Sequence, residues 1–333
     1  MRAMAKVFCN AGLSEGVMGL LREELGRIGG GELVLPTNGA TASNLVEGPS
    51  DQGLVHADVA FGQPNIADLL ASKTVKLVQL TSAGWARYER EDLAGALRGR
   101  GGALCTASGV YCEPCAEHVV AFMLAGARRL VGAWENQGGE RAGERGWPAG
   151  RLREESRLLV GQRVVLVGYG TIAARVAELL GPLRMEVVAL RRRVRGDERV
   201  RTREIGEAGE WVGWADHVVN ILPGTAETAG FFGRELLGRI KPGAMFYNIG
   251  RGTTVDQGAL LEGLVEGRIG GAFLDVTDPE PLPAGHGLWT APRCVVTPHT
   301  AGGFVGEGEA LVRHLVGNLE RWRRGEGLED RVV

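Results

Sequence analysis

Short aliphatic runs recur along the chain between Arg163 and Pro298, separated by longer stretches with helical spacing. The runs are continuously apolar rather than alternating, which is typical of strands covered on both faces. The stretches between them, such as 172–180 and 257–267, are typical of helices. This alternation predicts a parallel, doubly wound sheet. Its strands are expected at 164–167, 186–190, 217–222, 244–249, 271–275 and 294–297.

The same alternation is looser before about residue 107 and predicts a second, smaller α/β domain. Its strands are expected at 5–9, 32–35, 54–60 and 75–81, and its helices near 14–27 and 89–98. A long apolar helix, roughly Pro114 to Trp134, leads from it towards the first domain. The last helix is expected at about Glu307 to Arg324, because leucines there repeat every four residues.

The pattern therefore predicts a two-domain α/β protein. The larger domain is expected at 108–303, and the smaller one at 1–107 together with 304–333. The stretch 135–157 is rich in Gly, Arg and Glu, and is expected to be a mobile linker or an arm that rests on another subunit.

Composition narrows the class of protein. The 333 residues are 44% hydrophobic and 23% charged, as in ordinary soluble proteins. A net charge of -2 argues against a protein that binds polyanions such as nucleic acid. Met1 to Asn10 lack the pattern of a secretion signal, and no run of about 18 apolar residues predicts a membrane span. We expect a cytoplasmic protein.

Five cysteines are too few and too scattered for a disulfide framework. Cys112, Cys115 and His118 follow one another at intervals of three, but a metal site would need a fourth ligand, and none follows at a familiar spacing. We expect buried thiols that pack a helix, and no metal.

The clearest motif is a glycine turn between the first Rossmann strand and its helix, Gly168-Tyr169-Gly170-Thr171-Ile172-Ala173. Gly168 permits a tight turn, and Gly170 lets the backbone approach a pyrophosphate. Ala173 is small enough for the helix to pack closely on the strand. The pyrophosphate would meet free N–H groups at the helix start. The turn therefore predicts dinucleotide binding.

The end of the second strand indicates which dinucleotide is bound. An acidic residue there would bind the ribose 2′-hydroxyl of NAD. This chain has Arg191, Arg192 and Arg193 instead, and a guanidinium can pair with a 2′-phosphate. We expect NADP(H) to be favoured over NAD(H). The alternative is a solvated basic loop, because further arginines follow, mixed with Asp197, Glu198 and Glu204.

Polar residues follow three later strands: Arg251 after the fourth, Asp275 and Glu280 after the fifth, and His299 after the sixth. Ligands bind outside the carboxyl ends of such strands. Reduction of a carbonyl by hydride needs a proton donor, and an imidazole suits neutral pH. Glu280 could fix the tautomer of His299 and favour its protonated form. Arg251 could clamp a substrate carboxylate. Each residue also has a non-catalytic interpretation. His299 could be a capping histidine, Glu280 a loop glutamate and Arg251 a surface arginine.

These segments together resemble the D-isomer-specific 2-hydroxyacid dehydrogenase family over nearly the whole chain. The resemblance rests on 166–173, Asn220–Thr228, Tyr247–Gly252, Val255–Leu260, Gly271–Val276 and Thr297–His299. It implies a Rossmann-type, dinucleotide-binding domain at 108–303 and a smaller, flavodoxin-like, substrate-binding domain at 1–107 together with 304–333. It also implies that Arg251, Glu280 and His299 form the catalytic trio, and that Asp275 lies near the nicotinamide amide. It further implies that Leu222 and Pro223 line the adenosine side, and that the protein is a homodimer.

The resemblance also implies where the other ligands bind. The substrate carboxylate would meet backbone N–H groups of Ala83 and Gly84, with Trp85 as a pocket wall and with Arg251 and His299 beside it. Ala116-Glu117-His118 resembles the start of the family's interdomain helix, which favours a non-metal role for His118. The expected dinucleotide contacts are Gly168, Gly170, Thr171, Ile172, Arg191, Arg192, Leu222, Pro223, Thr228, Ile249, Gly250, Arg251, Asp275, His299 and Ala301.

The sequence thus predicts an enzyme that interconverts a small 2-oxo acid and a D-2-hydroxy acid with NAD(P)H, with glyoxylate or hydroxypyruvate as the leading substrates. Two departures stand out: Ala173 replaces a third glycine, and the acidic residue after the second strand is missing. The absence of a long carboxyl-terminal extension argues against a regulated phosphoglycerate dehydrogenase. Two alternatives remain open: a dinucleotide-sensing, corepressor-like binding protein, and a phosphite or formate dehydrogenase of the same fold.

Overall fold

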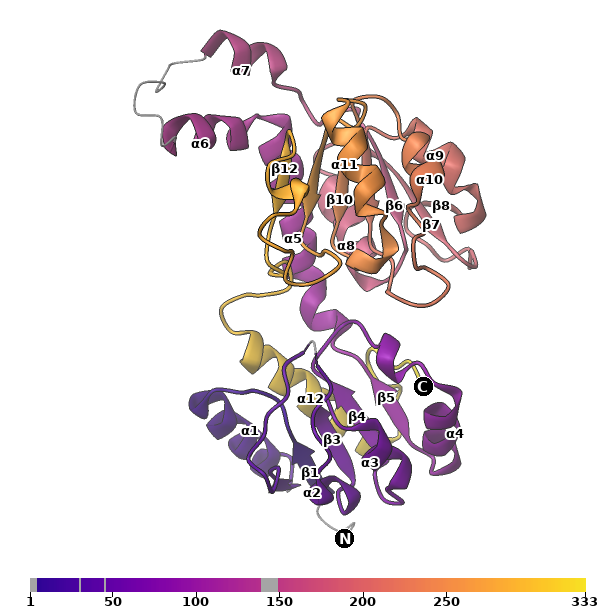
Figure 1. Cartoon of the computed structure of the whole chain (residues 1–333). Helices are drawn as coiled ribbons and strands as arrows, with labels where there is room; N and C mark the ends of the chain where they lie inside the picture. The colour runs from indigo at the N-terminus through magenta and orange to yellow at the C-terminus, as the bar shows by residue number, and fades with distance from the viewer. Residues whose placement is uncertain (1–4, 30, 45, 139–148) are drawn as a thin grey trace. The chain divides into compact units, whose positions relative to one another are not determined.

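A computed structural model describes residues 5–29, 31–44, 46–138 and 149–333 of the chain (Figure 1). The chain divides into two compact units. Unit 1 is formed by residues 1–111 and 303–333, and unit 2 by residues 112–302. Each unit is an α/β layer structure built on its own parallel sheet.

Unit 1 is built on a five-stranded parallel sheet in the order β2-β1-β3-β4-β5. Its strands are β1 (Ala5–Cys9), β2 (Gly31–Val34), β3 (Val59–Gly62), β4 (Leu77–Leu80) and β5 (Ala103–Cys105). Its helices are α1 (Glu15–Arg27), α2 (Gln52–Val55), α3 (Ile66–Ala71), α4 (Glu91–Gly99) and α12 (Glu307–Arg324). This strand order is the flavodoxin-like one that the sequence predicts.

Helix α12 joins unit 1 although it lies far along the chain. It packs against α1, so yellow and indigo segments lie side by side in Figure 1. The four-residue leucine repeat explains this contact, because Leu311, Leu315 and Leu319 are all buried. Acidic residues in the first turn and arginines in the last complement the helix dipole.

Unit 2 is built on a seven-stranded parallel sheet in the order β12-β11-β10-β9-β6-β7-β8. Its strands are β6 (Arg163–Val167), β7 (Glu186–Arg191), β8 (Arg201–Glu204), β9 (His217–Asn220), β10 (Met245–Asn248), β11 (Gly271–Leu274) and β12 (Cys294–Val296). Its helices are α6 (Leu130–Gly138), α7 (Ala149–Glu155), α8 (Thr171–Leu180), α9 (Ala208–Trp214), α10 (Arg234–Gly238) and α11 (Gln257–Val265). Helix α5 (Ser108–Ala127) begins in unit 1 and continues into unit 2.

Both faces of the seven-stranded sheet are buried. Val165 and Val167 of β6 pack with residues of α9, α10 and α11 on one face. Val164 and Leu166 of the same strand pack with α5 and α8 on the other. This two-sided burial explains why the strands are continuously apolar, and the doubly wound prediction is confirmed.

Two expected elements are wrong, two strands were missed, and the linker or arm expected at 135–157 stays a prediction. The apolar stretch from Pro114 to Trp134 is not one helix, because Arg129 takes a left-handed conformation (φ 56°) between α5 and α6. The expected strand at 54–60 is instead α2 followed by β3. The short strand β5 and the polar strand β8 were not predicted. Within the expected linker or arm at 135–157, the structure forms the end of α6 and all of α7, and 139–148 lie outside the described residues.

Candidate active site

Three neighbouring strands of unit 2 end level with one another. Asn248 of β10 pairs in register with Leu274 of β11, which pairs with Val296 of β12. The segments that follow therefore leave the sheet at the same edge. They carry Arg251, Asp275 and His299.

The imidazole of His299 is held by a carboxylate. Its Nδ1 lies 2.8 Å from Oε2 of Glu280, and both side chains are partly exposed. The other carboxylate oxygen of Glu280 accepts the N–H of Thr277 at 3.0 Å, which fixes the carboxylate. The pairing leaves Nε2 as the ring nitrogen directed away from Glu280.

Asp275 organises the loop that carries His299. Its carboxylate is buried and accepts hydrogen bonds from Oγ1 of Thr297 (2.7 Å), N–H of Thr300 (2.8 Å) and N–H of Ala301 (3.0 Å). Its carbonyl accepts the N–H of His299 at 2.9 Å. These bonds hold His299 in a left-handed conformation (φ 53°), which is uncommon outside glycine.

Two buried asparagines fix the segment that carries Arg251. Asn220 donates to Oδ1 of Asn248 at 2.9 Å and to Oγ1 of Thr254 at 2.7 Å. The hydroxyl of Thr254 donates to the carbonyl of Arg251 at 2.6 Å. The guanidinium of Arg251 itself donates to the carbonyl of Gly250 at 2.6 Å.

The glycine turn has the geometry of a pyrophosphate cradle. Gly168 has φ 101°, and a Cβ there would lie 2.9 Å from the carbonyl oxygen of Ile221. A Cβ at Gly170 would meet nothing within 4 Å, so the space beside this residue is open. Helix α8 starts at Thr171 without a side-chain cap, and Ile172 and Ala173 pack in the core beneath it. The uncapped N–H groups and the open space fit a dinucleotide phosphate.

The two arginines after β7 differ in their surroundings. Arg191 is mostly buried, donates to Oε1 of Glu198 at 2.8 Å, and lies 5.9 Å from the ring centre of Tyr169. Arg192 is exposed and pairs with exposed Glu227. Backbone N–H groups of Arg195 and Gly196 bind Glu198 and lower its pKa to about 2, so this carboxylate stays charged.

The loop after β9 folds on itself. The hydroxyl of Thr228 donates to the carbonyl of Pro223 at 2.5 Å and accepts the N–H of Thr225 at 2.9 Å. Leu222 is buried at the start of this loop, and its N–H donates to Oδ1 of Asn220. Ile249 and Gly250 lie next to it, since a Cβ on Gly250 would lie 2.6 Å from the carbonyl oxygen of Leu222.

In unit 1, Ala83, Gly84 and Trp85 follow β4. Ser82 shapes this turn by donating to the carbonyl of Gly84 at 2.7 Å. Within the described ranges, the N–H groups of Ala83 and Gly84 donate no hydrogen bond, so they are available to an anion.

The cysteines of helix α5 are not arranged for metal binding. Burial raises the pKa of Cys115 to about 12, so its thiol stays protonated. Across the residues with described positions, no three His, Cys, Asp or Glu side chains gather where a metal ion could bind.

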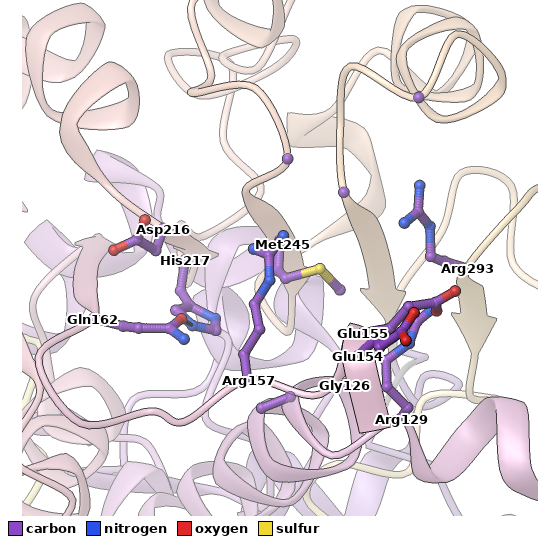
Figure 2. Close-up of a pocket in the computed structure, with 14 residues that line it drawn as sticks. Gly126, Arg129, Glu154, Glu155, Arg157, Gln162, Asp216, His217, Met245 and Arg293 are labelled. Carbon is purple, nitrogen blue, oxygen red and sulfur yellow. Dashed lines mark hydrogen bonds and ion pairs between the residues drawn. The ribbon is translucent and has the colours of Figure 1, made fainter. Parts of the chain in front are cut away.

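A hollow of about 360 Å³ lies at the opposite, amino-terminal edge of the seven-stranded sheet. Gln162, Asp216 and His217 lie on one side of it, and Arg129, Glu154 and Glu155 on the other (Figure 2). None of the predicted site residues lines it.

Sequence reasoning assigned no role to several polar residues that position the site, namely Asn220, Asn248, Thr254, Thr277, Thr297 and Thr300. The sequence does contain a signal for two of them. Asn220 and Asn248 are amides at the ends of largely apolar strands, where a buried polar group needs a partner.

Comparison with known proteins identifies the family. Residues 120–301, more than half of the chain, match the model described as D-isomer specific 2-hydroxyacid dehydrogenase, NAD binding domain. The chain belongs to the D-isomer specific 2-hydroxyacid dehydrogenase family. The resemblance inferred from the sequence is confirmed, and the protein is an NAD(P)-dependent dehydrogenase.

Curated relatives match this dehydrogenase over part of their length. A Corynebacterium melassecola protein of the proB 3′ region is 33% identical over 238 residues, 68% of this chain and 73% of the relative. Glyoxylate/hydroxypyruvate reductase B of Pectobacterium atrosepticum is 36% identical over 208 residues, 61% of this chain and 63% of the reductase.

Solved structures match the dehydrogenase over nearly its full length. The TT0316 protein of Thermus thermophilus is 29% identical with a TM-score of 0.74, and the match covers 98% of this chain and all of that one. A D-isomer specific 2-hydroxyacid dehydrogenase of Xanthobacter autotrophicus, solved with NADPH and MES, is 24% identical with a TM-score of 0.79, covering 99% and 98%. Both have the fold seen here.

No helix among the described residues has the length and apolar character to cross a membrane.

Proposed function

We propose that this dehydrogenase reduces a small 2-oxo acid to its D-2-hydroxy acid, with His299 as the acid and base. The observation that carries the proposal is the 2.8 Å contact between Nδ1 of His299 and Oε2 of Glu280. This pair follows strands that end level with the one preceding Arg251. A proton donor, its orienting carboxylate and a cation therefore follow adjacent strands, as carbonyl reduction needs.

In this mechanism, Glu280 holds Nδ1 of His299 and so aims Nε2 at the substrate oxygen. A bound dinucleotide supplies the hydride that is added to the carbonyl carbon. The proton on Nε2 of His299 passes to the carbonyl oxygen, and the imidazole recovers it in the reverse direction. Arg251 attracts the developing negative charge on that oxygen.

The substrate carboxylate is assigned to unit 1. The available N–H groups of Ala83 and Gly84 match a carboxylate, and partly buried Trp85 would form an apolar wall. Glyoxylate/hydroxypyruvate reductases among the relatives favour a short 2-oxo acid such as glyoxylate or hydroxypyruvate.

The dinucleotide is proposed to bind along 168–172, with its adenosine beside Leu222, Pro223 and Thr228. The nicotinamide end would lie near Ile249, Asp275 and Ala301. We favour NADP(H), because Arg191 is fixed by Glu198 at the end of β7, where a 2′-phosphate would meet its guanidinium. Arg192 is a second, more loosely held cation.

The dehydrogenase is proposed to be a cytoplasmic homodimer. The supporting observation is helix α6, which exposes Leu130 (53%) and Trp134 (75%). Large exposed apolar side chains close together are typical of an interface between proteins.

The test is an assay of purified protein with a panel of 2-oxo acids and both reduced dinucleotides. We expect turnover of glyoxylate or hydroxypyruvate, faster with NADPH. Parallel reactions supply formate or phosphite with NAD or NADP. Oxidation of those anions would replace the proposed substrate class, whereas tight dinucleotide binding without any turnover would favour a sensing protein.

A further inference from the structure

His118, on helix α5, faces the carboxylate that organises the His299 loop. Its Nε2 lies 3.4 Å from Oγ1 of Thr297 and 3.7 Å from Oδ1 of Asp275. The proton of the Thr297 hydroxyl is already used in the 2.7 Å bond to Asp275. The hydroxyl oxygen therefore accepts from Nε2–H of His118.

The imidazole is held in this orientation by aromatic neighbours. Its ring meets Phe122 edge-on at 4.5 Å, Phe122 stacks on Phe273 at 4.6 Å, and Phe273 stacks on Tyr247 at 5.4 Å. The ring is therefore anchored in the core between α5 and the sheet. Such packing limits the rotation of the side chain.

The burial of His118 favours its neutral form. Burial lowers the pKa of His118, although the nearby carboxylate of Asp275 acts in the opposite direction. Cys115, on the same helix, also interacts electrostatically with Asp275. A neutral imidazole with hydrogen on Nε2 can donate to the hydroxyl oxygen of Thr297, which in turn donates to Asp275.

We propose that His118 is a positioning residue, which holds Asp275 and Thr297 so that their loop keeps His299 in its catalytic conformation. The inference rests on the proposed function for its effect on turnover. Its structural part does not, because the N–H groups of Thr300 and Ala301 report directly on the bonds to Asp275.

The experiment compares His118→Leu, which cannot donate, with His118→Gln, whose amide can. Hydrogen–deuterium exchange is measured for the peptide spanning 297–301, and kcat and KM are measured for the best substrate. We expect exchange in His118→Leu to be at least tenfold faster and kcat about tenfold lower, with KM for the dinucleotide changed less than twofold. His118→Gln should stay within about threefold of the unchanged protein.

Val119→Ala is the packing control, because Val119 is fully buried on the same helix and its aliphatic side chain can form no hydrogen bond to Asp275. It should lower stability and leave exchange at 297–301 unchanged. The proposal is overturned if His118→Leu exchanges like the unchanged protein, or if His118→Leu and His118→Gln behave alike. If the unchanged protein reduces no 2-oxo acid, the proposed function fails, and the exchange result still decides the role of His118.

Discussion

His299 combines two unusual constraints in a single residue. Its backbone is left-handed, which costs a non-glycine residue about 1 kcal/mol, and its ring is tied to Glu280. The backbone constraint is maintained by Asp275, whose carboxylate and carbonyl bind four groups of residues 297–301. The ring constraint is maintained by the N–H of Thr277, which fixes the Glu280 carboxylate. These bonds give His299 a defined position, as its proposed role of proton donor requires.

The first prediction concerns this pair. His299→Ala should lower kcat about a hundredfold or more, because no proton donor would remain at Nε2. Glu280→Gln should lower it less, since an amide can still orient the ring. Steady-state kinetics at several pH values provide the measurement. An unchanged kcat in His299→Ala would remove His299 from the mechanism.

The second prediction separates the two arginines. Arg191→Ala should weaken NADPH binding about tenfold or more and leave NADH nearly unchanged, because a charge-assisted bond to phosphate is lost. Arg192→Ala should have a smaller effect, because its side chain is exposed and its ion pair is screened by solvent. Titration of tryptophan fluorescence with each dinucleotide measures both. Equal weakening of NADPH and NADH would contradict the 2′-phosphate assignment.

At the scale of elements, burial on both faces made the strands of unit 2 readable from the sequence. The misses have physical causes. Strand β8 reads Arg-Thr-Arg-Glu and lies at the edge of its sheet, so it carries no apolar run. The left-handed residue after α5 is Arg129 and not a glycine, so residue type does not mark the break. The candidate site was readable in part: His299, Glu280 and Arg251 follow from chemistry at strand ends, whereas His118 needs the packing of α5 against the sheet.

A third prediction tests a turn between elements. Arg184 connects α8 to β7 with φ 54°, and the residue is exposed. Arg184→Gly should raise the free energy of unfolding by about 0.5–1 kcal/mol, because glycine adopts this conformation without strain. Arg184→Ala is the matched control and should change stability little. Urea denaturation measures both, and a destabilised glycine variant would refute the expectation.

At the scale of the whole molecule, the free energy of unfolding at acid pH should depend on His217, which lines the hollow shown in Figure 2. Burial lowers its pKa to about 4, and its ring nitrogens contact Tyr247 and Gln162. Because the folded pKa lies below the unfolded value, the unfolded state takes up a proton first as pH falls. Stability is fully present above about pH 6.5 and is lost towards pH 4.

Between pH 7.5 and 4.5, this histidine should account for about 2–3 kcal/mol of lost stability. His217→Gln removes the titrating group, so its loss over this interval should be smaller by that amount. Denaturant unfolding at the two pH values gives the comparison. Equal losses in both proteins would show that His217 takes up its proton at the same pH in the folded and unfolded states.

The fifth prediction concerns assembly. Trp134→Glu should shift a dimer towards the monomer, because a charge would replace an exposed aromatic side chain at the proposed interface. Sedimentation velocity over a range of protein concentrations measures this. Trp289→Glu is a control, because Trp289 is also exposed (46%) but lies away from α6 in sequence. A monomer in the unchanged protein would refute the dimer.

The path of the chain between units has a consequence for biosynthesis. Unit 2 is one continuous stretch, 112–302, so a ribosome delivers it whole. Unit 1 needs 303–333 as well, because α12 fills part of its core and the N–H of Val332 bonds to Leu104 of β5. The first hundred or so residues to leave the ribosome must therefore wait, with the α12 side of their sheet uncovered, while unit 2 is made. We therefore expect chaperones to bind the first part of unit 1, residues 1–111, during synthesis.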